Sequence, residues 1–122
     1  MWLFYFVVKD KLSIFVADIK EIIDMRVISQ KKIKNFYGQP EHEGAKISFQ
    51  RWYHTVINRD YRSFAQILAD FNDTVRENDL YVFSLDEGKY KIVTSIYFDT
   101  GCIYVRFVGT VSDYRTFVVD HE

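Results

Sequence analysis

Residues 80–108 read LYVFSLDEGKYKIVTSIYFDTGCIYVRFV, and this stretch decides the fold class. It holds three runs rich in β-branched and aromatic residues, separated by the short turns DEG and DTG. Such runs predict β-strands, and short turns join antiparallel neighbours at little cost in loop-closure entropy. We therefore predict an antiparallel meander near the end of the chain.

Upstream of the meander, the spacing of apolar residues changes to that of helices. A short β-branched run, MRVIS at residues 25–29, is followed by QKKIKNFYG. Ser29 is well placed to cap a helix there, and Gly38 and Pro40 mark its end. The next segment, QPEHEG, has the composition of a turn.

Two more helices are predicted between this turn and the meander. From Ala45 onward, apolar residues recur three or four positions apart until Asn58 breaks the pattern. Ser63 then resembles an N-cap for a helix through FAQILADF. Helices first and sheet last predict one α+β domain, with N-terminal helices packed on an antiparallel sheet. The stripe of the longer helix comprises Ile47, Phe49, Trp52, Tyr53, Val56 and Ile57.

Composition excludes several classes of protein. The 122 residues fit one domain. The chain has 16 Lys and Arg against 17 Asp and Glu, so it lacks the overall positive charge with which a whole domain binds nucleic acid. A single cysteine, Cys102, excludes an internal disulfide and a CxxC zinc site, which favours a reducing, intracellular setting. The apolar start MWLFYFVV ends at Lys9. It lacks the positive n-region of a secretory signal peptide, and it is too short to span a membrane.

The two faces of the predicted sheet differ in polarity. Alternation along residues 89–98 places Lys89, Lys91, Val93, Ser95 and Tyr97 on one face, and Tyr90, Ile92, Thr94, Ile96 and Phe98 on the more apolar core face. On the last strand, alternation separates Ile103, Val105 and Phe107 from Tyr104, Arg106 and Val108.

Lys91 and Arg106 are therefore expected on the same, less apolar face. Cations with neighbouring tyrosines suit a phosphate-bearing single strand, since cations hold phosphate oxygens and rings stack on bases. A half-exposed sheet face also carries such residues when it has no function. The pattern leaves both interpretations open.

Other kinds of site have little support. His42, His54 and His121 lack metal-ligand spacing, so we expect no metal. The chain has no GxSxG, Walker or GxGxxG motif, and we expect no cofactor. Cys102 has no base beside it in the sequence and is expected to be a small buried hydrophobe, while the acidic pair at 86–87 is turn chemistry.

Several blocks in a fixed order give the chain a family resemblance. They are MRVISQKKIKNFY, then WY and YRSFAQILADF, then VFSLDEGKYKIVTSIYF, and last IYVRFVGT with DY. With these blocks, residues 25–117 resemble the HigB family of type II toxins, in the RelE-like superfamily of mRNA interferases. The resemblance implies a toxin that cuts messenger RNA on the ribosome, and a HigA-type helix-turn-helix antitoxin as its partner in the cytoplasm, with no role for a membrane.

The resemblance also implies roles for the polar sheet face. In this metal-independent chemistry the ribose 2′-hydroxyl attacks the adjacent phosphate. Arg106 would then stabilise the developing charge, Lys91 would add a second cation where family members often have arginine, and Tyr114 would stack on a base or transfer a proton. The expected catalytic residues are these three. The expected RNA-binding residues are Lys89, Tyr104 and Arg115.

The chain departs from the family pattern near Tyr114. Family members usually read GTH, two residues, then Tyr and an acid, whereas this chain reads GTVSDYR. Val111 stands where the histidine would be and Arg115 where the acid would be, and valine cannot transfer a proton. Cleavage is then slow, or Tyr114 and Lys91 carry it, or the chain binds antitoxin, ribosome or RNA without cutting. A purely structural interaction module is a further, weaker hypothesis.

Residues 1–24 precede the family resemblance. We expect a strand or an amphipathic helix there, since Leu12, Phe15, Val16, Ile19, Ile22 and Ile23 form one apolar stripe. The segment is an N-terminal extension or the product of an upstream start codon, and its stripe would pack on the domain or on a second copy in a homodimer. Residues 25–122 are expected to form the HigB-like toxin domain.

Overall fold

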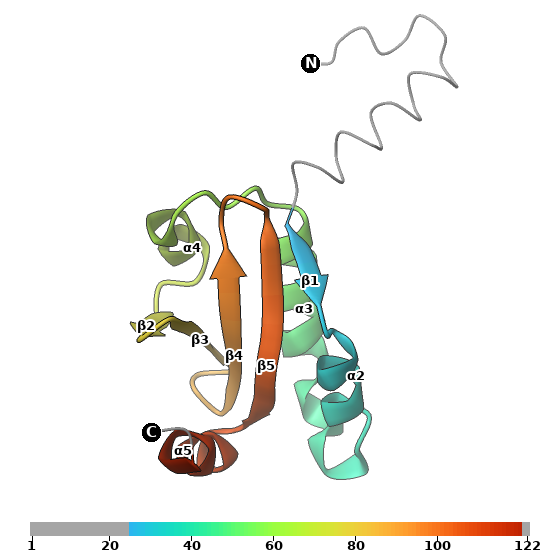
Figure 1. Cartoon of the computed structure of the whole chain (residues 1–122). Helices are drawn as coiled ribbons and strands as arrows, with labels where there is room; N and C mark the ends of the chain where they lie inside the picture. Colours follow the sequence, from blue (N-terminus) through green and yellow to red (C-terminus); the bar gives the residue numbers. More distant parts are fainter. Residues whose placement is uncertain (1–24, 121–122) are drawn as a thin grey trace, which may run out of the picture.

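The computed structural model of the chain describes residues 25–120, without the side chains of residues 119 and 120 (Figure 1). The predictions for residues 1–24, including a homodimer through them, and for His121 lie outside this part. In chain order the elements are β1 (Arg26–Ile28), α2 (Lys31–Tyr37), the 3-10 helix η1 (Pro40–Ala45), α3 (Lys46–Ile57), α4 (Phe64–Asp70), β2 (Val75–Glu77), β3 (Leu80–Leu85), β4 (Tyr90–Tyr97), β5 (Cys102–Thr110) and α5 (Val111–Asp120).

The strands form one mixed sheet in the order β1-β5-β4-β3-β2. From β2 to β5 each strand is antiparallel to the next, which confirms the predicted meander and the α+β fold. The sequence did not reveal β2 or the parallel pairing of β1 with β5. That pairing places β1, the first described strand, at one edge of the sheet beside β5, the last strand.

The core lies between α3 and the sheet, where α3 runs behind β1 and β5 in Figure 1. Phe49, Trp52 and Val56 are buried at helical spacing, and the Trp52 and Phe83 rings form a T-shaped contact with ring centres 5.3 Å apart. Ile47 was predicted in the same stripe but is 67% exposed, because a position two residues before Phe49 lies on the opposite side of the helix from the buried face. The apolar pattern thus predicted the helix correctly, but it assigned too many residues to the buried face.

Three local predictions in the helical half need correction. Ser29 does not cap α2, since it has φ 71° and its carbonyl accepts the Lys32 amide in a turn before the helix. Most of the segment QPEHEG, residues 39–44, which was predicted as a turn, belongs to η1, which runs from Pro40 to Ala45. Ser63 does occupy the N-cap position of α4, but its side chain forms no capping hydrogen bond.

A β-bulge in β5 overturns the predicted alternation on that strand. Val93 pairs with Phe107, whereas Thr94 pairs with Val105, so Arg106 is an extra residue without a partner on β4. Beyond the bulge, each residue of β5 lies on the opposite face from the one that unbroken alternation predicts. Phe107 therefore lies on the polar face and Val108 packs against the core, the reverse of the prediction.

The chain after β5 forms a helix that the sequence analysis did not predict. The Thr110 hydroxyl accepts the Asp113 amide at 3.1 Å, and the Asp113 carboxylate accepts the Thr110 amide at 3.2 Å. This reciprocal pair is a capping box that starts α5 at Val111. Within residues 25–120, no helix has the length and apolar character needed to cross a membrane.

Candidate functional site

The face of the sheet that points away from α3, here called the open face, carries the residues predicted to bind RNA. Pairing of Lys91 with Ser84 and of Ser95 with Tyr104 places all four on this face. Arg106 joins them because the bulge leaves it beside Ser95. Lys91 and Arg106 therefore do lie on one face.

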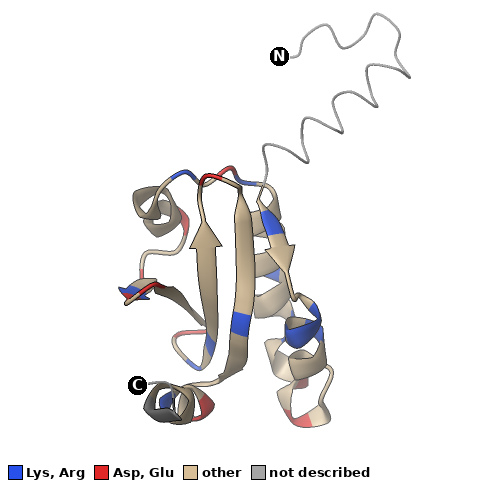
Figure 2. Ribbon diagram, in the orientation of Figure 1, with Lys and Arg blue, Asp and Glu red and all other residues tan. Residues whose placement is uncertain are grey.

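Arg106 is an exposed cation on this face, and β5 carries it as the blue band in Figure 2. Its Nε donates a hydrogen bond to Ser95 Oγ at 2.9 Å, and its guanidinium carbon lies 5.5 Å from the centre of the Tyr104 ring. Within residues 25–120 it forms no ion pair with a carboxylate. The guanidinium is thus oriented by neutral partners and keeps donors free for an anion.

Lys91 is held in a different way. Its ammonium group donates to Ser84 Oγ at 2.7 Å and lies 5.8 Å from the centre of the Tyr114 ring. The side chain is half-buried beneath α5. Two contacts with uncharged side chains therefore hold the ammonium group at the point where α5 approaches β4.

Tyr114 occupies the second turn of α5 above Lys91. Burial, and then the nearby Glu77 carboxylate, raise the pKa of the Tyr114 hydroxyl above its usual value. The hydroxyl therefore stays protonated at neutral pH and can donate a hydrogen bond or a proton. It is not suited to remove a proton from a substrate.

The open face holds two separate groups of candidates. One consists of Arg106, Ser95 and Tyr104, and the other of Lys91, Ser84 and Tyr114. Lys91 and Ser95 are four residues apart on β4, about 13 Å at roughly 3.3 Å per residue.

An aromatic contact lies near both groups. Phe107, directly after Arg106, meets Phe117 of α5 with ring centres 4.8 Å apart. The structure brings Lys91 to Tyr114 but does not bring Arg106 to either of them. The arrangement suits an extended anion that touches both groups.

The remaining predicted residues lie at the margin of this face. Lys89 is exposed in the turn between β3 and β4, 3.9 Å from the Asp86 carboxylate. Arg115 is exposed on α5. Val111, at the position of the family histidine, starts α5 and donates its amide to the Lys89 carbonyl at 2.9 Å. That bond ties the β3–β4 turn to the start of α5.

The sequence analysis missed a basic surface beside Arg106. Lys32, Asn35 and Gln39 project from the α2 region and line a cavity of about 310 Å³ with Arg106 and Phe107. The run KKIK was the available signal, and Figure 2 shows its positive charges on α2 next to β5. The α2 lysines form no ion pair with an acid within the described residues. The positive charge of Arg106 thus continues onto α2.

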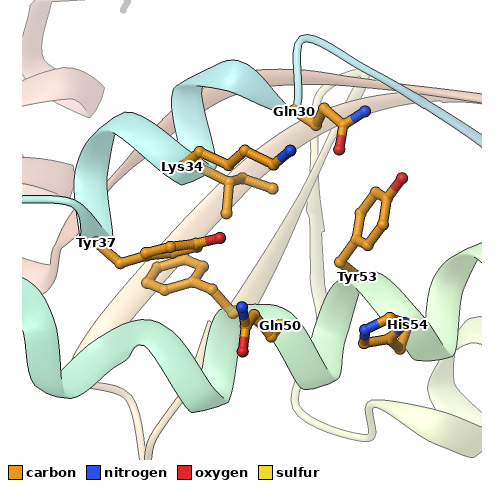
Figure 3. A pocket seen from close by; sticks show the side chains of 8 residues that line it. Gln30, Lys34, Tyr37, Gln50, Tyr53 and His54 are labelled. Atoms are coloured by element: carbon orange, nitrogen blue, oxygen red, sulfur yellow. The ribbon is translucent and has the colours of Figure 1, made fainter.

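A second groove lies between α2 and α3, in the helical layer. Figure 3 shows Lys34 and Tyr37 of α2 and Gln50 and Tyr53 of α3 extending into the gap between the two helices. The cavity measures about 340 Å³, and Ile33 and Phe49 also line it. It shares no lining residue with the open face, so the two surfaces are distinct.

The described residues offer no site for a metal ion. No cluster of three or more His, Cys, Asp or Glu side chains able to hold a metal occurs among residues 25–120. His42 stacks on Phe36 with ring centres 4.2 Å apart, and His54 lies near Tyr53 with ring centres 5.9 Å apart. Cys102 is half-buried, with its thiol 3.8 Å from the Thr100 carbonyl.

Comparison with known families gives one match. The family described as HigB_toxin, the RelE-like toxic component of a toxin-antitoxin system, matches residues 45–117. The matched span covers more than half of the chain and runs from η1 into α5, including Lys91, Arg106 and Tyr114. No curated protein matches the chain.

Proposed function

Because the chain belongs to the HigB family of RelE-like toxins, the toxic components of toxin-antitoxin systems, we propose that it is a ribosome-dependent mRNA interferase. The observation that carries this proposal is the orientation of two cations, Arg106 and Lys91, by neutral partners on one open face. Family membership implies an antitoxin partner. That this antitoxin is of the HigA type, with a helix-turn-helix domain, and that the toxin acts in the cytoplasm, belong to the proposal.

The reaction needs charge stabilisation more than bond-forming groups on the protein. The ribose 2′-oxygen attacks the neighbouring phosphorus, loses its proton to a base, and the bond to the 5′-oxygen breaks, which leaves a cyclic phosphate and a 5′-hydroxyl. Arg106 presents free N–H donors to the phosphate oxygens as their negative charge grows. Loss of such a contact costs ~3 kcal/mol of barrier.

Lys91 and Tyr114 act at the second position on the open face. The ammonium group of Lys91 holds a further phosphate oxygen. Tyr114, with its raised pKa, fits the role of a hydrogen-bond donor or of the acid that protonates the leaving 5′-oxygen. The proton of the 2′-hydroxyl must then go to the ribosomal RNA, to water or to another protein group.

A second candidate function rests on Val111. Valine stands where family members have a histidine, and the raised pKa of Tyr114 makes that tyrosine a poor replacement as a base. A chain that keeps the cations but lacks the base would bind RNA or the ribosome and block translation without cutting. This alternative shares every binding contact with the interferase and differs from it only in the chemical step.

Translation of a reporter message in a purified system, with the products mapped by primer extension, separates the two. An interferase stops translation and leaves cuts in phase with the codons, and the cuts need ribosomes. A binding protein stops translation and leaves the message intact. A well-folded chain that does neither would refute both functions.

A further inference from the structure

A pocket lies between α5 and the β2–β3 hairpin, next to the Lys91 and Tyr114 pair. It measures about 300 Å³, near the lower end of the range for ligand pockets, roughly 300 to 1,000 Å³. Tyr114 contributes one aromatic wall, and Glu77 and Asn78 are its two polar lining residues. The other lining residues are apolar: Leu80, Val82, Val93, Phe117 and Val118.

This combination matches the chemistry of a nucleobase. Apolar and aromatic walls accept the faces of a planar ring, while the polar groups can reach hydrogen-bonding atoms at its edge. Glu77 is exposed and has no cationic partner within residues 25–120, so its carboxylate is free to accept hydrogen bonds. A carboxylate selects an amino group, which adenine, cytosine and guanine carry and uracil lacks.

The pocket is also in the right place relative to the phosphate-binding cations. Tyr114 both lines the pocket and holds its ring against the ammonium group of Lys91. A phosphate held by Lys91 would therefore leave its attached nucleoside at the mouth of the pocket. Asn78, with φ 55°, sits in a two-residue connection between β2 and β3, which fixes Glu77 and Asn78 at the end of the hairpin.

We propose that this pocket binds one base of the RNA, and that Glu77 selects bases with an exocyclic amino group by accepting a hydrogen bond from it. This inference rests on the proposed function, because it requires RNA on the open face. It adds a base-selecting residue outside the three predicted catalytic residues. Uracil is disfavoured because it has no amino group, and its single N–H donor on the pairing edge lies between two carbonyl oxygens that repel the carboxylate.

Binding of the full chain to uncleavable 2′-O-methyl oligonucleotides tests the proposal. Fluorescence anisotropy with labelled oligo(A), oligo(C) and oligo(U) should show about tenfold weaker binding of oligo(U). Glu77→Gln should abolish this difference, because a carboxamide can accept from an amino group and also donate to a carbonyl. Glu87→Gln, which removes the same charge from an exposed turn away from the pocket, should keep the preference.

Two results would overturn the inference in distinguishable ways. If the native chain binds all three oligonucleotides equally and Arg106→Ala weakens all three, the open face binds RNA but the pocket does not select a base. If Glu77→Gln keeps the preference, Glu77 is not the residue that selects the base. If the native chain binds no RNA, alone or on ribosomes, the pocket and the proposed function both fall.

Discussion

The ammonium group of Lys91 on β4 lies 5.8 Å from the centre of the Tyr114 ring on α5, while Ser84 of β3 accepts its hydrogen bond at 2.7 Å. Three elements therefore fix one positive charge. A cation over an aromatic ring contributes about 0.5 to 1 kcal/mol at an exposed site. The position of α5 and the direction of Lys91 are thus coupled.

Replacing Lys91 should weaken RNA binding in a salt-dependent way. A lysine that contacts phosphate releases about one counterion, so Lys91→Met should reduce the slope of log affinity against log salt concentration by about one. Titration of an uncleavable oligonucleotide at several salt concentrations measures this slope. Lys46→Met, which removes an exposed lysine from α3, is the control, and equal slopes for both variants would show that Lys91 does not touch phosphate.

Val111→His should restore the acid-base group that the family pattern places there. If its absence limits the chemical step, cleavage on the ribosome should rise by about 100-fold or more, since general acid-base catalysis contributes about 10² to 10⁴. Primer extension over a time course gives the rate. Val111→Gln is polar but cannot transfer a proton at neutral pH. A comparable gain in both variants would argue against proton transfer.

Thr110→Ala should destabilise α5 without touching the core. The substitution removes the hydroxyl that accepts the Asp113 amide, and loss of a helix cap costs about 1 kcal/mol. Denaturant unfolding gives the change in the free energy of unfolding. Thr116→Ala, an exposed site on the same helix, should change it much less. Equal effects would mean that the capping box does not stabilise α5.

The Asp70 carboxylate should make stability depend on pH. It accepts hydrogen bonds from the Tyr61 hydroxyl at 2.6 Å and from Arg59 Nε at 2.8 Å, and its side chain is 23% exposed. The Tyr61 bond, helped by Arg59 and opposed by burial, lowers the pKa of Asp70 below its ordinary value of 3.8. The folded state therefore holds this proton less tightly than the unfolded state, and the stabilisation is present above that value.

Asp70→Asn should lower the free energy of unfolding by about 1 kcal/mol at pH 7, a figure that allows for solvent screening. The difference from the native chain should shrink as the pH falls below 3.8 and through the lowered pKa. Urea unfolding from pH 7 to pH 3 measures it. Asp73→Asn, at an exposed loop site, serves as the control. A difference that does not change with pH would show that ionisation of Asp70 is not its cause.

The sheet could be predicted where its determinants are local. The turns at residues 86–88 and 99–101 are short, so the strands they join must pair with each other, and alternation placed Lys91 and Ile92 on the correct faces. The pairing of β1 with β5 joins residues from opposite ends of the described chain. Local propensity carries no information about such a contact, because it depends on how the intervening helices pack.

The site was harder to predict for two separate reasons. Alternation assumes an unbroken pleat, and the bulge at Arg106 moves Phe107 to the other face, where it meets Phe117. The start of α5 did have a sequence signal, since Thr110 and Asp113 have the spacing of a capping box. Because α5 was not predicted, neither the approach of Tyr114 to Lys91 nor the pocket beside Glu77 could be foreseen.

The most direct test of the account is cleavage of a message by the purified chain on programmed ribosomes, mapped by primer extension. The native chain and Arg51→Ala, which removes an exposed arginine from α3, should both leave codon-phased cuts. Arg106→Ala should reduce cutting by about 100-fold or more while keeping its fold. Absence of cuts from well-folded native chain, or equal cutting by Arg106→Ala, would contradict the claim that the open face is the active site of an mRNA interferase.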